Sequence, residues 1–180
     1  MIEKFKTLFF VKSSLISLYL ALTIPIPFIS IDKLKILSIT AFVLGLYLII
    51  NITSDYVETC NNKISYKTSF ISRTLGRKNW EIFWKDIKLI ESLPTSQGSK
   101  VYYFNTKKGD NFLIPQRVEN FEKFLLIVSK NTGIATNELS YISPLWTYKL
   151  LTFLSVLMIT GELFALSLIH ISEPTRQSSI

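Results

Sequence analysis

Residues 13–31, SSLISLYLALTIPIPFISI, and residues 36–54, ILSITAFVLGLYLIINITS, decide the fold class, because neither stretch contains a charged residue. A helix needs about 20 predominantly apolar residues to cross a hydrocarbon core about 30 Å thick. Only the four residues DKLK, at 32–35, separate the two stretches, and they are too few to form a domain. The sequence therefore predicts an N-terminal transmembrane helical hairpin over residues 1–54.

The composition agrees with a membrane protein that also carries a folded polar domain. Of the 180 residues, 48% are hydrophobic and 18% are charged, which is too apolar for an ordinary soluble domain and too charged for a bundle wholly within lipid. The net charge of +7 suits nucleic acid, an anionic lipid surface or the basic cytoplasmic side of a membrane protein. The hairpin favours the last two, and because no aromatic-plus-basic motif stands out, we expect no nucleic-acid partner.

Short strand-like segments follow the hairpin, with turn residues between them. Ile64, Tyr66, Thr68 and Phe70 alternate with polar residues, the period of a half-buried strand. The dipeptide Asn61-Asn62 before them suits a two-residue hairpin turn. In all, the pattern predicts six strands, at 56–60, 64–70, 79–84, 87–93, 101–106 and 111–114. This spacing is typical of an antiparallel barrel or sandwich.

A helix is predicted from about residue 118 to 131, where the strand pattern ends after Pro115. Gly133 lies just beyond it, as a C-terminal cap would. The apolar residues that recur at helical spacing, and that we expect to face the strands, are Phe121, Phe124, Leu125 and Val128. With this helix the β domain is expected to cover residues 55–142.

A third apolar run, residues 150–165, follows Trp146 and Tyr148, which suit a membrane interface. It is interpreted as a third transmembrane segment, within 143–165, and a buried soluble helix is the alternative. Residues 166–176, LSLIHISEPTR, resemble eleven consecutive residues of one translated frame of a transposase-based sequencing adapter. We therefore expect 166–180 to be an artefact that truncates the third helix, and such segments are excluded from fold reasoning.

The orientation follows from the Lys and Arg residues. Residues 55–149 carry fourteen Lys/Arg against nine Asp/Glu, and the N-terminal segment has three Lys against one Glu. Because Lys/Arg excess favours the cytoplasmic side, the N-terminus and the β domain are predicted to lie in the cytoplasm. The single cysteine, Cys60, agrees with a reducing compartment. The expected location is a bacterial inner membrane or a thylakoid.

No catalytic motif stands out. The chain lacks a Gly-rich phosphate loop, a His-Glu-x-x-His motif and paired cysteines. Its only histidine, His170, lies in the adapter-like segment. The sequence therefore predicts no catalytic residue, cofactor or metal, and a protein that is not an enzyme.

A basic and aromatic group of residues is the candidate surface for a lipid or a protein partner. Basic residues near an anionic leaflet contribute about 1 kcal/mol each, although a solvated polar face is the alternative. Trp80 and Trp84 would share one face of a regular strand, as core residues or as an exposed edge for a partner. The candidate residues are Lys63, Lys67, Arg73, Arg77, Lys78, Trp80 and Trp84.

Three stretches, DYVETCNNKISYKTSF from 55, GRKNWEIFWKDIKLIES from 76 and VYYFNTKKGDNFLIP from 101, resemble the bacterial pleckstrin-homology-like (PH-like) domains of small membrane proteins. The resemblance covers about residues 55–132. It implies a seven-strand, partly open barrel plugged by one helix, so a seventh strand is expected within 71–78. Members of that family are mostly of unknown function, are regarded as membrane-associated binding or scaffolding modules, and supply no catalytic residues.

These observations predict a non-enzymatic α+β integral membrane protein whose PH-like domain binds a membrane-protein partner or the lipid surface. Two alternatives stay open. Two N-terminal spans before a small β domain are also similar to the photosystem I assembly factor of thylakoids, although the third apolar run departs from that pattern. The second alternative is an accessory subunit of a transporter or enzyme.

Overall fold

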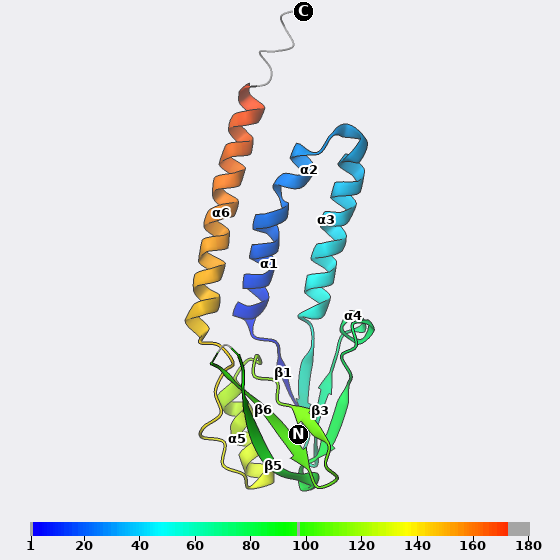
Figure 1. Cartoon of the computed structure of the whole chain (residues 1–180), viewed down its shortest axis with the longest axis vertical. Coiled ribbons are helices and arrows are strands. Elements are labelled where there is room, and N and C mark those ends of the chain that lie inside the picture. Colours follow the sequence, from blue (N-terminus) through cyan, green and yellow to red (C-terminus); the bar gives the residue numbers. More distant parts are fainter. Residues whose placement is uncertain (1, 97, 173–180) are drawn as a thin grey trace, which may run out of the picture. The chain divides into compact units, whose positions relative to one another are not determined.

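The computed structural model describes residues 2–96 and 98–172, and the chain forms two compact units. The β unit consists of Asn51–Leu145 together with the N-terminal residues up to Val11. The helical unit consists of Lys12–Ile50 and of the residues from Trp146 onward. Two antiparallel sheets and three long apolar helices make this a mixed α+β chain, as the sequence predicts (Figure 1).

Within the described part of the chain, three helical segments are long and apolar enough to cross a membrane. The first, Phe9–Ile29, is made of α1 (Phe9–Thr23) and α2 (Pro25–Ile29). The second is α3 (Asp32–Ile52), and the third is the Leu145–Leu168 part of α6 (Leu145–Ser172). Of the predicted artefact at 166–180, residues 166–172 continue α6 and residues 173–180 lie outside the described part of the chain. The artefact and the truncation of the third helix therefore stay predictions.

The first apolar segment is divided at Pro25. Helix α1 ends at Thr23 and α2 begins at Pro25, because proline lacks the N–H for the helical ladder and its ring clashes with the preceding turn. Between α1 and α3, the Tyr19 hydroxyl donates a 2.8 Å hydrogen bond to the Phe42 carbonyl. Gly45 lies directly against the Tyr19 ring, and a Cβ there would overlap it. A glycine at 45 therefore allows α1 and α3 to approach closely.

The described residues of the β unit form seven strands in two antiparallel sheets. The first sheet has the order β1 (Glu3–Lys6), β2 (Tyr56–Thr59), β3 (Lys63–Lys67) and β4 (Trp80–Phe83). The second has the order β5 (Ile87–Pro94), β6 (Lys100–Thr106) and β7 (Asn111–Leu113), and the single 3-10 turn η1 (Trp84–Asp86) links the sheets. The six strands predicted from the sequence are all present, and the Cys60 N–H closes the predicted Asn61-Asn62 turn on the Lys63 carbonyl at 2.8 Å.

The predicted seventh strand within residues 71–78 is wrong. That segment begins with the short helix α4 (Phe70–Thr74), and the seventh strand is β1 at the N-terminus. In β1 only Phe5 is buried, at 3% exposure, while Lys4 forms a 3.0 Å ion pair with Glu58 of β2. A four-residue strand with three charged residues carries no clear alternating pattern, so its pairing is decided by β2, more than 50 residues later.

One hydrophobic core joins both sheets to helix α5 (Phe121–Thr132). As predicted, Phe121, Phe124, Leu125 and Val128 of this helix are buried. Phe124, fully buried, packs edge-on against Phe5 of β1 with their ring centroids 5.5 Å apart. The helix begins three residues later than the sequence indicates, because the preceding segment bridges to the chain around Thr7 before turning into α5.

The strand register places two helix connections at one end of the first sheet. Lys6 of β1 pairs with Tyr56 of β2, which in turn pairs with Lys67 of β3. Helix α1 begins three residues after Lys6, and α3 ends four residues before Tyr56. We call the end of the first sheet that contains Lys6, Tyr56 and Lys67 the junction end. The opposite, distal end contains Lys63 and the β2–β3 turn.

Candidate functional site at the junction end

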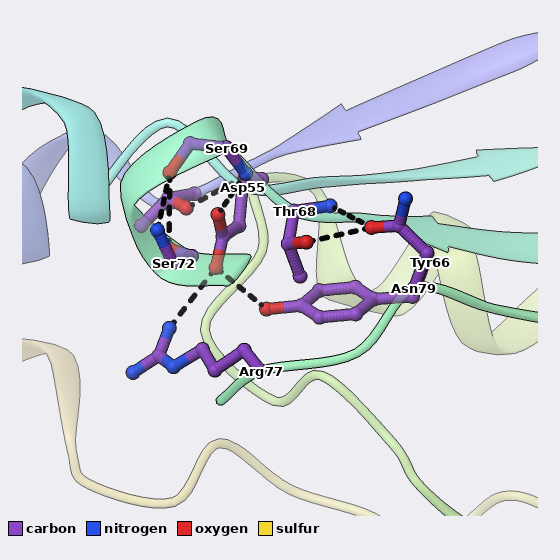
Figure 2. Close-up of polar contacts among 8 residues, drawn as sticks. Asp55, Tyr66, Thr68, Ser69, Ser72, Arg77 and Asn79 are labelled. Atoms are coloured by element: carbon purple, nitrogen blue, oxygen red, sulfur yellow. Dashed lines mark hydrogen bonds and ion pairs between the residues drawn. The ribbon is translucent and has the colours of Figure 1, made fainter. Parts of the chain in front are cut away.

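A buried carboxylate, Asp55, organises the junction end. It lies three residues after α3 and is 4% exposed. Its Oδ1 accepts a hydrogen bond from the Ser69 N–H at 2.8 Å, and its Oδ2 accepts from the Tyr66 hydroxyl and from Arg77 Nη1, each at 3.0 Å (Figure 2). Because Ser69 and Arg77 flank α4, one carboxylate holds both ends of that helix. The Asp55 carbonyl also accepts from the Thr7 hydroxyl at 3.0 Å, which ties β1 to the same point.

Helix α4 is short but capped at both ends. At its start, the Ser69 hydroxyl accepts a hydrogen bond from the Ser72 N–H. At its end, the Gly76 N–H donates to the Arg73 carbonyl and the Arg77 N–H donates to the Ser72 carbonyl, both at 3.0 Å. This pair of bonds is the Schellman motif, which needs the left-handed conformation that Gly76 adopts at φ 87°. Ser69 at the N-cap and Gly76, seven positions later in the C-terminal turn, are the sequence signal that could have predicted this helix.

Hydrogen bonds between Thr68 and Asn79 join the two ends of the segment that lies between them. The Asn79 side-chain carbonyl accepts from the Thr68 N–H at 2.7 Å and from the Thr68 hydroxyl at 2.6 Å (Figure 2). Residues 69–78, which we call the α4 loop, therefore leave the sheet as a closed unit. Together with the Asp55 contacts, these bonds fix the position of the α4 loop on the junction end.

The Tyr66 hydroxyl is held in its protonated form. Burial, and next the negative charge of Asp55, raise the pKa of Tyr66 to about 12. Its ring stacks on Trp80 with the centroids 5.8 Å apart. Tyr66 is therefore a permanent hydrogen-bond donor to Asp55 at physiological pH, and it links the α4 loop to the edge of the core.

The structure separates the five predicted basic residues into two groups. Lys63 lies at the distal end, where its 2.8 Å bond to Glu81 raises the pKa of Lys63 and lowers the pKa of Glu81. The other four, Lys67, Arg73, Arg77 and Lys78, lie in the α4 loop or at the adjoining end of β3. Arg77 is paired with Asp55, and none of the other three forms an ion pair with a described residue.

The two candidate tryptophans do not share an exposed strand face. Strand β4 ends at Phe83, so Trp84 begins η1. There it is 4% exposed and donates from Nε1 to the Cys60 carbonyl at 2.8 Å. Trp80 is half-buried and packs against Phe112, with the ring centroids 5.5 Å apart. Trp84 thus belongs to the core and Trp80 to its margin.

Two exposed apolar side chains of the α4 loop were missed by the sequence reasoning. Phe70 is 72% exposed and Leu75 is 65% exposed. The alternating pattern predicts Phe70 in a half-buried strand, whereas the helical turn directs it away from the core and Ser72 is fully buried. Within the described ranges, no three His, Cys, Asp or Glu side chains gather where they could hold a metal ion. The junction end thus combines a buried carboxylate network with exposed apolar and basic side chains.

Fold and site together define a mixed α+β protein with three helices suited to span a membrane and a β unit attached to them at its junction end. No protein-family model matches the chain. It is 30% identical over 170 residues to "Uncharacterized protein slr0269" of Synechocystis sp. (strain ATCC 27184 / PCC 6803 / Kazusa), an alignment that covers 91% of this chain and 85% of the relative. The chain belongs to the same family as that protein.

Proposed function

We propose that this is a non-enzymatic integral membrane protein with three spanning helices. Its β unit acts as a PH-like module that binds the lipid surface or a membrane-protein partner. The observation that carries the proposal is the pairing of Lys6 with Tyr56. If α1 and α3 cross the membrane, this pairing keeps the junction end of the β unit next to the bilayer.

The same pairing supports a hairpin that crosses the membrane twice. The residues before α1 and the residues after α3 share one sheet, so they must lie on the same side of a bilayer. An even number of crossings between β1 and β2 satisfies this condition. The Lys/Arg excess of both segments favours the cytoplasmic side, so the β unit is cytoplasmic and the turn around Leu34 is external.

The architecture of the β unit supports the PH-like part of the proposal. Sheets of four and three strands share a core with one C-terminal helix, α5. A PH-like domain is likewise expected to have seven strands and one helix. Here the chain between β1 and β2 contains α1, α2 and α3, so the proposed membrane hairpin is an insertion between the first two strands.

Thiol labelling tests the membrane topology. In a Cys60→Ser background, Leu34→Cys should react with a membrane-impermeant maleimide in intact cells, while Lys108→Cys should react only after lysis. Lys108 is exposed in the β6–β7 turn, and it is preferable to its neighbour Gly109, whose φ of 90° disfavours a side chain. Labelling of Lys108→Cys in intact cells would contradict the orientation.

Purification in mild detergent tests the binding role. Recovery of the chain alone with bound lipid supports a lipid-surface module, and a stoichiometric complex with one membrane protein supports a protein partner. Catalytic activity that co-purifies with the chain and disappears with it would favour the accessory-subunit alternative and contradict a free-standing module.

A further inference from the structure

We propose that the α4 loop is a lipid-contact element that docks on the anionic headgroups of the leaflet in which α3 ends. The inference rests on the proposed membrane anchoring and adds to it a site and a ligand class. The relevant residues are the exposed apolar pair Phe70 and Leu75 and the cations Arg73 and Lys78.

Connectivity places the α4 loop close to the end of α3. Asp55 follows Ile52, the last residue of α3, by three residues, which span at most about 11 Å even when fully extended. The Asp55 carboxylate is bonded to Ser69 and Arg77 on either side of α4. Because Asp55 is bonded on both sides of α4, an apolar helix that ends at a membrane surface keeps the base of the α4 loop near that surface.

The exposed apolar side chains of the α4 loop do not pack into the core of the β unit. Phe70 and Leu75 are 72% and 65% exposed, and they flank α4 at its first residue and at its C-cap. The fully buried Ser72 and the capping bonds hold the loop so that these two residues remain outside. Apolar and aromatic side chains beside basic residues are typical of segments that lie in the interfacial region of a bilayer.

The charge of the α4 loop fits an anionic surface. Residues 68–80 contain three basic residues and no Asp or Glu. The nearby acid, Asp55, is buried and faces Arg77, so the exposed ends of Arg73 and Lys78 meet no opposing carboxylate among the described residues. Lys63 at the distal end differs from Arg73 and Lys78, because its charge is paired with that of Glu81. Each cation near an anionic leaflet favours contact by about fivefold.

Depth-dependent quenching in proteoliposomes tests the contact in the full chain. In the Cys60→Ser background, a cysteine at Thr74, exposed in α4, carries an environment-sensitive fluorophore, and a matched sample carries it at Lys108. The vesicles contain phosphatidylcholine alone or with phosphatidylglycerol, plus brominated lipid as the quencher. We expect quenching at position 74 in the anionic vesicles, several times weaker in neutral ones, and none at position 108. It should decline as salt shortens the Debye length from about 10 Å at 0.1 M to about 3 Å at 1 M.

Paired variants identify the side chains responsible. Arg73→Gln with Lys78→Gln should weaken the contact by about 25-fold, and Phe70→Ser with Leu75→Ser should remove the quenching that resists salt. The matched control, Lys107→Gln with Lys108→Gln in a chain labelled at Thr74, alters two exposed cations of the β6–β7 turn and should change nothing. Arg77 is left intact because its loss would break the Asp55 network. Unchanged tryptophan emission shows that each variant remains folded.

The outcomes separate this inference from the proposed function. Equal quenching at positions 74 and 108, or the same quenching in neutral and anionic vesicles, overturns the lipid-contact element. If Leu34→Cys and Lys108→Cys label as expected, the membrane anchoring still stands. Protection of position 74 in native membranes but not in proteoliposomes also overturns the inference, and it identifies a protein as the occupant.

Discussion

The Asp55 carboxylate and the Arg77 guanidinium lie 3.0 Å apart although 22 residues separate them. The carboxylate is almost fully buried, at 4% exposure, while the Arg77 side chain is 55% exposed. The pair therefore connects the segment that follows α3 with the outer side of the α4 loop. The same carboxylate accepts from Tyr66 and Ser69, so this one buried group makes several of the contacts that hold α4 in position.

Asp55→Asn should destabilise the β unit by about 2–4 kcal/mol, because a neutral amide cannot accept all three hydrogen bonds and loses the charge that faces Arg77. Denaturation in detergent, followed by tryptophan fluorescence, measures the change. Asp110→Asn is the control, since Asp110 is exposed in the β6–β7 turn and should shift stability by less than about 0.5 kcal/mol. Equal midpoints for both variants would show that the Asp55 network does not stabilise the fold.

The raised pKa of Tyr66 predicts a loss of stability at high pH. The unfolded phenol ionises near its ordinary pKa of 10 and the folded one near 12. The unfolded state therefore binds fewer protons in that interval, and the stability present below pH 10 declines as pH rises to 12. The decline attributable to Tyr66 is at most about 2–3 kcal/mol, reduced by solvent screening because the ring is only partly buried.

Comparison with Tyr66→Phe isolates this effect from the lysines that titrate in the same range. Wild type should be the more stable protein at pH 9, since Tyr66→Phe lacks the hydrogen bond to Asp55. The difference in unfolding midpoint between the two should shrink steadily from pH 10 to 12. A difference that stays constant across this range would contradict the assignment of a raised pKa to Tyr66.

Phe124→Ala should cost about 3–5 kcal/mol, the usual range for removing a fully buried phenylalanine from a core. The measurement requires the full chain, because Phe124 packs against Phe5 of β1, which lies before the helical hairpin. Leu126→Ala on the same helix is the control, since Leu126 is 70% exposed. If both substitutions lower the melting midpoint equally, α5 does not close the core through Phe124.

Gly45→Ala should weaken the hairpin, because the new methyl group overlaps the Tyr19 ring and displaces the hydroxyl from the Phe42 carbonyl. Overpacking of this kind costs about 1–3 kcal/mol. Gly161→Ala in α6 is the matched control, because among the described residues a Cβ there meets no atom within 4 Å apart from the adjoining backbone of its own helix. Thermal unfolding in detergent compares the two, and Tyr19→Phe should recover part of the loss at Gly45→Ala. Absence of any such coupling would contradict direct contact between the two positions.

The sequence predicts much of the local structure correctly. Long uncharged stretches indicate the apolar helices, because length and composition alone decide whether a helix can span a bilayer. Alternation at Ile64 and Tyr66 indicates β3, and the helical spacing of Phe121, Phe124 and Val128 indicates the buried face of α5. Each of these signals is contained within one element, so each can be recognised without knowing the rest of the fold.

What the sequence by itself determined is thus most of the elements: the apolar helices, the six strands from β2 to β7 with the turns between them, and helix α5. Only the tertiary structure decided that Glu3–Lys6 completes the first sheet, and that Lys63 is separated from the other cations while Trp84 is buried. It also decided that Asp55 holds the α4 loop. The physical reason is that these outcomes depend on pairing between residues far apart in the chain. Strand register and a buried carboxylate create such pairs, and local periodicity does not encode them.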